Sequence, residues 1–456
     1  MSRSERIAAW LPGRLAELVA EHGIPGAQAA VLVDGEVLDA AAGVLNLATG
    51  VRATTESVFQ IGSITKVWTA TLVMQLVDDG LLDLDAPVVR YLPEFRVADA
   101  AATAVITTRQ LLDHTVGIDG DLFHDTGSGD DAVAKYLGTI TEAAQIHPPG
   151  EMFSYCNSGY VVLGRIVEVL RGKPFGQVLR ERIADPLGLT HLATNANEAI
   201  VHRAALGHVP GEGGSQVPAP VWSLTPSNAP AGSLLAMRAR DLLGWARAHL
   251  DGGGPILSAE SAKAMRVKQV DVPYIGALAE AWGLGWELFD WGADVFGHDG
   301  GTIGQSAFLR ISGTANVAVA LLTNSIDGGK VYKDLVVPLM RDLAGADVPD
   351  DPTPPADPEP LDGHRVAGVY NTPMIGQAVT VDERGRGWIT VTPLTDEARA
   401  LMGTRTFEVV KLRENSLIAV EEEHGRYQVF TLVGSDDRGR AEYLFSSRAA
   451  VRTESE

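Results

Sequence analysis

Cysteine and long apolar runs are both scarce in this sequence. The 456 residues include one cysteine, Cys156, so the chain cannot form an internal disulfide. No run of about 18 apolar residues occurs, so the sequence predicts no helix that spans a membrane. The first 23 residues mix charged and apolar side chains without a continuous apolar core, and we therefore expect no secretory signal. Together these absences favour a cytoplasmic protein.

Basic residues are also few relative to acidic ones. The chain has 37 Lys and Arg against 58 Asp and Glu, which gives a formal net charge of −21. Nucleic acids and anionic membranes are therefore not expected as partners, because their phosphates would be repelled. The charge does not argue against a peptide or an ester as substrate. With 45% hydrophobic residues, the chain can build a large core and is long enough for more than one domain.

The stretch 59–82, FQIGSITKVWTATLVMQLVDDGLL, places a serine and a lysine at the start of an apolar helical pattern. Ser63 and Lys66 are three residues apart, so on a helix they lie on one face. A lysine beside a serine hydroxyl can act as its base, and the positive end of the helix favours developing negative charge. The alternative is an N-cap serine followed by a solvated lysine, so partners elsewhere must decide.

Two further segments supply such partners. The first, MFSYCNSGYVVLG at 152–164, contains Tyr155 and Asn157 on either side of Cys156. The second, VFGHDGGTIGQSAFL at 295–309, contains His298 followed by a glycine two residues on. The order S-x-x-K, Y-x-N, H-x-G resembles the serine β-lactamase and penicillin-binding-protein superfamily, in particular its class C-type members.

The resemblance implies a role for each motif residue. Ser63 would form the acyl-enzyme, and Lys66 would be its base once burial lowers the pKa of the amine toward neutrality. Tyr155 would pass the proton to the leaving group, and Asn157 would hydrogen-bond both Lys66 and the substrate amide. His298 occupies the place of the family's lysine, where it can polarise the phenol or stabilise a phenolate.

The glycines after His298 have expected roles as well. Gly300 would leave room for the acyl chain, and the N–H of Gly301, with that of Ser63, would form an oxyanion hole worth about 3 kcal/mol per donor. Asp299 projects to the opposite face of the strand, and we expect a contact there without a catalytic role. Cys156 is expected to be an inert packed thiol. No cofactor and no metal are expected.

The remaining pattern predicts an α/β (α+β) fold. Strands are expected at 26–33 and 36–46, joined by a tight turn at Asp34-Gly35, and again within 282–324. A helical region is inserted between these strands, and a helix follows at 331–344. We expect an antiparallel sheet covered by helices on one side, similar to β-lactamases and transpeptidases, over residues 1–346. His114 is expected to be structural, and the acidic segment 119–131 to be a solvated loop at the mouth of the cleft.

The segment 347–362, DVPDDPTPPADPEPLD, predicts an extended linker. Short alternating runs in 363–456 then indicate a small antiparallel β-barrel that resembles the lipocalin-like domain of some family members. This domain is expected to affect substrate choice more than the chemistry. Arg448 and Arg452 are candidates for contact with an anionic substrate group, although surface solvation is the favoured role for both.

The chain is most similar to penicillin-binding-protein-type thioesterases of nonribosomal peptide assembly. That resemblance implies release of a peptidyl thioester by head-to-tail macrocyclisation, with the substrate presented by a peptidyl carrier protein. A cytoplasmic esterase or D-amino-acid peptidase that transfers the acyl group to water is the alternative. A binding module with an inactive site is a third reading, which the complete set of motif residues disfavours.

Overall fold

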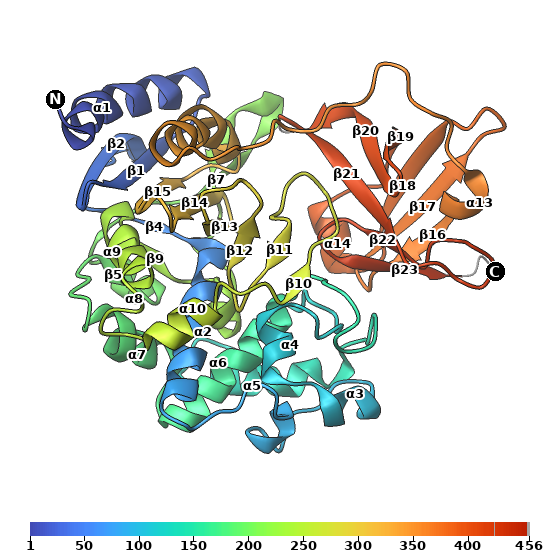
Figure 1. Cartoon of the computed structure of the whole chain (residues 1–456), viewed down its shortest axis with the longest axis horizontal. Helices are drawn as coiled ribbons and strands as arrows, with labels where there is room; N and C mark the ends of the chain where they lie inside the picture. The colour runs from blue at the N-terminus through green and yellow to red at the C-terminus, as the bar shows by residue number, and fades with distance from the viewer. Residues whose placement is uncertain (424, 454–456) are drawn as a thin grey trace.

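The computed structural model describes residues 1–423 and 425–453, and its largest element is a nine-stranded sheet (Figure 1). All neighbouring strands pair antiparallel. In spatial order the strands are β10 (Val270–Asp271), β11 (Ala281–Trp282), β12 (Glu287–Phe289), β13 (Val295–Thr302), β14 (Gln305–Ser312), β15 (Val317–Thr323), β1 (Gly26–Val33), β2 (Glu36–Asn46) and β3 (Val51–Arg52). The predicted hairpin is present, and Asp34 and Gly35 both adopt positive φ as its turn requires.

Helices cover both faces of this sheet, which corrects the expectation of one covered side. One face packs against α1 (Arg3–Glu21) and the C-terminal helical segment α11 (Gly328–Val331), η7 (Tyr332–Val336), α12 (Val337–Leu339) and η8 (Met340–Ala344), whose side chains form one core with the strands. The other face packs against the inserted helices. All eight residues of β1 are buried, since both alternations of this strand are apolar or small.

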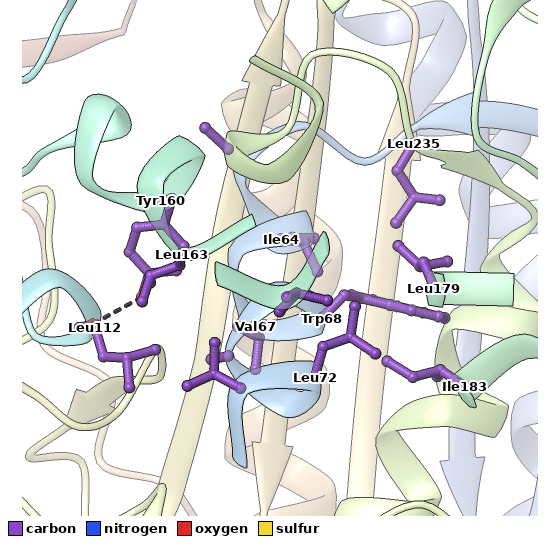
Figure 2. Close-up of a cluster of buried hydrophobic side chains, with 14 of the residues drawn as sticks. Ile64, Val67, Trp68, Leu72, Leu112, Tyr160, Leu163, Leu179, Ile183 and Leu235 are labelled. Carbon is purple, nitrogen blue, oxygen red and sulfur yellow. Dashed lines mark hydrogen bonds between the residues drawn. The ribbon is translucent and has the colours of Figure 1, made fainter. Parts of the chain in front are cut away.

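The inserted helical block surrounds α2 (Thr65–Asp78), whose residues 65–76 are all buried. Trp68 of α2 stacks on Trp245 with ring centroids 4.8 Å apart, and Figure 2 shows it packed among aliphatic side chains from several elements. Tyr160 donates a hydrogen bond to the carbonyl of Leu112 at 2.7 Å in the same cluster. The helices of the block are α3 (Ala100–Val105), α4 (Thr108–Leu112), α5 (Ala132–Thr139), α6 (Asn157–Arg171), α7 (Phe175–Leu179), α8 (Ala196–Ala199), α9 (Ala239–Leu250) and α10 (Ala259–Ala264).

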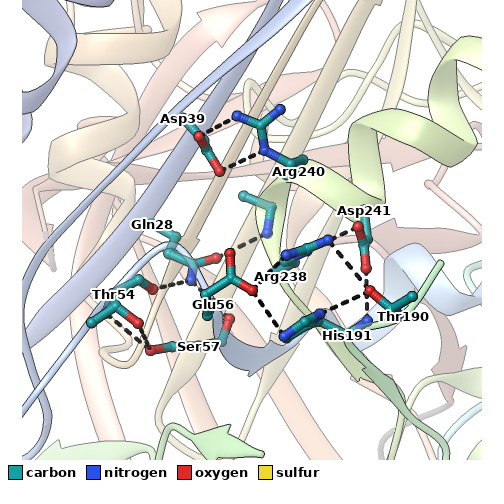
Figure 3. A network of polar contacts seen from close by, with 11 residues as sticks. Gln28, Asp39, Thr54, Glu56, Ser57, Thr190, His191, Arg238, Arg240 and Asp241 are labelled. Atoms are coloured by element: carbon teal, nitrogen blue, oxygen red, sulfur yellow. Dashed lines mark hydrogen bonds and ion pairs between the residues drawn. The ribbon is translucent and has the colours of Figure 1, made fainter.

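A polar network holds the strand that leads to α2 (Figure 3). Gln28, buried on β1, donates to the carbonyls of Thr54 and Ser57 at 2.5 and 2.7 Å, and its amide oxygen accepts from the N–H of Ala239 at 2.9 Å. Strand β4 (Ser57–Gln60) lies in a small sheet with β5 (Leu192–Ala193), β9 (Ala236–Met237) and β6 (Arg203–Ala204). The network therefore ties β4 to both the large sheet and α9.

The C-terminal strands close into an eight-stranded antiparallel barrel with its own core, as predicted. Its strands are β16 (Gly368–Asn371), β17 (Ile375–Val381), β18 (Gly387–Pro393), β19 (Arg405–Arg413), β20 (Ser416–Glu423), β21 (Arg426–Val433), β22 (Tyr443–Phe445) and β23 (Ala449–Thr453), with α13 (Gly363–Val366) before β16 and α14 (Asp396–Leu401) after β18. The 345–361 segment that precedes the barrel contains no helix or strand. Among the described residues, no helix is long and apolar enough to cross a membrane.

The barrel packs against the catalytic part of the chain through the turn between β22 and β23. Phe445 and Ala449, on either side of this turn, share a buried cluster with Phe153, Tyr155 and Trp282. The backbone is joined as well, because the N–H of Tyr155 donates to the carbonyl of Ser447 at 3.0 Å. The barrel is therefore anchored beside the Y-x-N motif.

Candidate active site

Ser63 lies in a short 3-10 turn, η1 (Gly62–Ile64), directly before α2. The long helix therefore begins two residues later than the sequence pattern indicated. Ser63 does not cap α2, because the N-cap position is Ile64, which makes no side-chain capping hydrogen bond. The alternative of an N-cap serine is thereby removed. The Ser63 side chain is partly exposed, in contrast to its buried neighbours Ile61 and Ile64.

Lys66 is fully buried, and its amine points at the serine. Nζ lies 3.0 Å from Ser63 Oγ and donates to the carbonyl of Ala231 at 2.6 Å. Burial lowers the pKa of Lys66 well below its ordinary value, and the positive charge of Arg448 lowers it further. A neutral amine with a free lone pair can accept the proton of the Ser63 hydroxyl.

Tyr155 is buried next to the same hydroxyl. Burial raises the pKa of its phenol above the ordinary value, while the neighbouring Ser63 side chain acts in the opposite direction. The ring stacks on His114 with centroids 4.3 Å apart, and Lys66 Nζ lies 4.9 Å from the ring centroid. His114 Nδ1 accepts the N–H of Cys156 at 2.9 Å, so this histidine supports the motif backbone, in line with the structural role expected for it.

Asn157 begins α6, but its side chain does not reach the partner we expected. Its Nδ2 donates to Asp121 at 2.8 Å, and within the described residues no hydrogen bond joins it to Lys66. Asn157 therefore holds Asp121, whose negative charge acts on the pKa of Lys66, and does not make the expected hydrogen bond to Lys66. Cys156 is fully buried, its Sγ accepts from the N–H of Gly159 at 3.2 Å, and burial raises the pKa of the thiol to about 12, as suits an inert packed cysteine.

Asp121 and Arg448 form a bidentate ion pair inside the site. Arg448 Nε and Nη2 donate to the two carboxylate oxygens of Asp121, each at 2.8 Å, and the guanidinium carbon lies 4.7 Å from the Tyr155 ring centroid. Arg448 comes from the β22–β23 turn of the barrel, next to Ser447, whose φ is +75°. The position of Asp121 corrects the expectation that 119–131 is only a solvated loop, and the partly exposed Arg448 is held in an ion pair and is not simply a solvated surface residue.

His298 on β13 is buried, and hydrogen bonding fixes which of its nitrogens carries the proton. Nδ1 lies 2.5 Å from the carbonyl oxygen of Asp299, and because a carbonyl only accepts, Nδ1 must donate. Burial and the charge of Lys66 lower the pKa of His298 to about 3, so the ring is neutral. Nε2 is then an unprotonated acceptor, with no partner among the described residues. It cannot donate to a Tyr155 phenolate, so of the two expected roles only polarisation of the phenol, through a hydrogen bond accepted at Nε2, is compatible with this tautomer.

Asp299 and Arg452 lie outside the reacting centre. Asp299 projects to the second face, as expected, and accepts from Arg310 Nη1 at 2.6 Å and Nη2 at 3.1 Å. Arg452 stays within the barrel, where it bonds the carbonyls of Arg365, Ala367 and Ala441 and the hydroxyl of Tyr370. The structure does not bring Arg452 to Ser63. Because its donors are already bonded within the barrel, Arg452 stabilises the barrel.

Backbone segments around Ser63 pack so closely that there is no room for a side chain at two glycines. A methyl group at Gly300 would overlap the carbonyl oxygen of Ile61, and one at Gly232 would overlap that of Gly62. Gly62 itself has φ +52°. The turn η1 is therefore clamped between β13 and the loop before β9, with the Gly301 backbone beside Gly62. This places the N–H groups of Ser63 and Gly301 on neighbouring segments, as an oxyanion hole requires.

Comparison with known proteins agrees with this geometry. A family model described as Beta-lactamase matches residues 12–335 of the chain. The chain belongs to the beta-lactamase family. This member is 44% identical to penicillin-binding protein 4 of Amycolatopsis lactamdurans over 364 residues, which cover 78% of the chain and 96% of that protein.

Two structures of SurE resemble this beta-lactamase-family chain over nearly its whole length, barrel included. The first has a TM-score of 0.80 at 28% identity and covers 99% of this chain and all of SurE. The second, SurE with D-Leu, has a TM-score of 0.77 at 29% identity and covers 98% and 100%. A D-amino acid amidase from Ochrobactrum anthropi SV3, complexed with D-phenylalanine, gives 0.58 at 26% identity over 69% of this chain and 91% of the amidase.

Sequence reasoning missed two features of the site. Asp121 follows Gly120, whose carbonyl accepts the N–H groups of Asn157 and Ser158, so the loop is held at the start of α6. No local spacing signals this contact. The carbonyl of Ala231 was missed because every residue has a backbone carbonyl, so the sequence does not show which one accepts a hydrogen bond from Lys66.

Proposed function

We propose that this serine hydrolase-family chain is a stand-alone thioesterase that releases a nonribosomal peptide by head-to-tail macrocyclisation. Ser63 Oγ attacks the thioester carbonyl while neutral Lys66 accepts its proton, and the tetrahedral oxygen rests on the N–H groups of Ser63 and Gly301. The thiol leaves with a proton returned through Lys66 and Tyr155. An ester on Ser63 remains.

In the second half the peptide's own N-terminal amine attacks this ester. The Tyr155–Lys66 pair accepts the proton that the amine loses, while the neutral Nε2 of His298 can accept a hydrogen bond. The amide bond closes the ring, the ester bond breaks, and Ser63 regains its proton. A bound peptide that holds its amine near the ester gains a high effective concentration over water.

The pairing of Asp121 is the observation that carries the choice of amine over water. A hydrolase needs a base that activates an ordered water, and Asp121 is a carboxylate near both Lys66 and Tyr155. Both of its oxygens accept from Arg448, and Asn157 adds a third bond. Burial acts to raise the pKa of Asp121, but the charge of Arg448 and the hydrogen bonds from Arg448 and Asn157 lower it below the ordinary value. The carboxylate is therefore a weak base.

The comparisons support the same proposal. SurE is matched over the catalytic part and the barrel together, and one of its structures holds D-Leu. We therefore propose a peptidyl donor with a D-configured C-terminal residue, delivered as a thioester of a peptidyl carrier protein in the cytoplasm. The amidase likeness favours the second candidate, an esterase or D-amino-acid peptidase that uses water.

A synthetic peptidyl thioester with a free N-terminus and a D-configured C-terminal residue tests this choice. The expected main product is the cyclic peptide, which differs from the linear acid by one water in mass spectrometry. Ser63→Ala should give neither product. The same peptide with an acetylated N-terminus is the matched control, since it can form the acyl-enzyme but cannot cyclise. Mainly linear acid across several lengths and both C-terminal configurations would favour the hydrolase.

A further inference from the structure

A buried carboxyl group lies on the Nδ1 side of His298 and has no part in the reaction described above. Glu287 lies on β12, pairs in register with Gly297 of β13, and is 2% exposed. A carboxyl group so deeply buried is costly unless its neighbours satisfy it. Its contacts therefore indicate what it is for.

The polar contacts described for the Glu287 carboxyl group lead to the residues around His298. The N–H of Asp299 donates to Glu287 Oε1 at 3.3 Å, and the same oxygen lies 3.6 Å from His298 Nδ1. On the other side, Oε2 lies 4.0 Å from Arg310 Nη1, and Arg310 in turn is bound by the Asp299 carboxylate. Glu287 thus holds the N–H of Asp299, the residue whose own carbonyl, in the following peptide unit, accepts the His298 proton.

The charges in this cluster leave the imidazole neutral. Arg310 and Asp299 form a closed pair, and burial raises the pKa of Glu287 to about 8, so at neutral pH its carboxyl group is mostly protonated. An ionised carboxylate at this place would favour an imidazolium, which has no lone pair to accept a proton. The cluster instead supplies hydrogen bonding at Nδ1 without a net negative charge.

We propose that Glu287 is a positioning residue that keeps His298 protonated at Nδ1, with Nε2 presented to the reaction as an acceptor. The effect is indirect: Glu287 holds the Asp299 N–H, and the Asp299 carbonyl then faces Nδ1. The inference deepens the proposed function and rests on it for what Nε2 accepts. The tautomer itself is independent of the substrate.

Nitrogen NMR of protein labelled with 15N-histidine measures this tautomer directly. The chain has 11 histidines, and comparison with His298→Gln identifies the relevant signals. At neutral pH the wild-type protein should show His298 protonated at Nδ1 and unprotonated at Nε2. A proton on Nε2 in the wild type would overturn the proposal without any variant of Glu287.

Two substitutions at Glu287 separate positioning from simple packing. Glu287→Gln is neutral, keeps an oxygen that can accept the Asp299 N–H, and should preserve both the tautomer and most of the acylation rate. Glu287→Leu removes the acceptor and should give a mixture of tautomers. Its kcat should fall by about 10- to 100-fold with little change in KM, as is typical when the partner that orients a histidine is lost.

Glu280→Leu is the matched control, because Glu280 is an exposed acid on the neighbouring strand connection whose carboxylate accepts from Asp290. It should change neither the tautomer nor kcat. An unchanged His298 tautomer in folded Glu287→Leu would refute the proposal, as would a shifted tautomer in Glu287→Gln. Should Glu287→Leu not fold, the wild type and Glu287→Gln still decide. A linear product in the thioester assay would refute cyclisation but leave the tautomer result standing.

Discussion

At the scale of single residues, the charge state of Lys66 governs the site. Burial is the largest influence and lowers the pKa of its amine, the charge of Arg448 lowers it further, and Asp121 acts in the opposite direction. The fraction of Lys66 present as the free amine is therefore set by a balance that includes a residue from the barrel. Acylation should rise with pH as the remaining protonated amine loses its proton.

Arg448→Gln tests this balance. Removing the cation removes an influence that lowers the pKa of Lys66 and leaves the opposing charge of Asp121 unpaired, so the pKa must rise. More Lys66 is then protonated at pH 7, and the rate should fall by about tenfold, with the pH profile displaced to higher pH. The measurement is the rate at which a fluorophosphonate labels Ser63 between pH 6 and about 10.

Arg438→Gln is the control for that experiment, because Arg438 is an exposed arginine of the same barrel. Its profile should match the wild type. A profile of Arg448→Gln that lost rate equally at every pH would mean that Arg448 does not act on the charge of Lys66.

Lys66 and Tyr155 should behave as one proton-transfer unit, since both reach the Ser63 hydroxyl. Lys66→Ala, Tyr155→Phe and the double variant should lose similar activity in ester hydrolysis. Losses that multiply in the double variant would show two independent contributions. Labelling by a fluorophosphonate should disappear in Ser63→Ala, and modification at Ser306 would contradict the assignment.

The sequence was sufficient for residues whose relation is local. Ser63 and Lys66 are three apart on one helical turn, and Tyr155 and Asn157 flank one residue, so spacing alone brings them together. Asp121 and Arg448 could not be paired in this way, because 327 positions separate them and only the docked barrel makes them neighbours. The proton on His298 Nδ1 likewise depends on a backbone carbonyl, whose position cannot be predicted from residue types.

At the scale of elements, the crossing of η1 and β13 sets the geometry of the oxyanion hole. The strand pattern predicted β1, β2 and the later strands well, because turns and alternation are local. It failed for the helices over the sheet. Strand β1 reads GAQAAVLV, with apolar or small side chains on both faces, which indicates that both faces of the sheet are covered. The order of helices along the sequence does not show which face each helix covers.

Gly300→Ala should disturb this crossing. The new methyl group would overlap the Ile61 carbonyl, so β13 must move away from η1. We expect a loss of about 1–3 kcal/mol of folding stability and a lower rate of acylation. Gly301→Ala is the matched comparison, since a methyl group there has open space. Thermal unfolding should show a lower Tm for Gly300→Ala only, and equal Tm values would refute the clamp.

At the scale of the whole molecule, the barrel takes part in the active site. The sequence predicted its strands but assigned it to substrate choice. The structure shows Phe445 and Ala449 packed on Phe153 and Trp282, with Arg448 inside the site. The expectation that the barrel affects substrate choice more than the chemistry is therefore revised.

Truncation after residue 350 should abolish turnover of both a small activated ester and a long peptidyl thioester. It removes Arg448 and uncovers the apolar surface around Tyr155. Full-length Arg448→Gln, which keeps that cover, should retain more activity than the truncated chain. Wild-type turnover of the small ester by the truncated chain would restore the view of the barrel as a substrate-choosing domain.

The location of Arg448 in the β22–β23 turn also affects the order in which the site is assembled during synthesis of the chain. During translation Arg448 is made after every other side chain of the site, so a growing chain holds its serine, lysine and tyrosine long before the barrel hairpin exists. Lys66 lacks its cationic neighbour and Tyr155 its backbone partner until that hairpin docks. Full reactivity of Ser63 should therefore follow the docking of that hairpin, and a nascent chain that stalls before Arg448 should be acylated slowly.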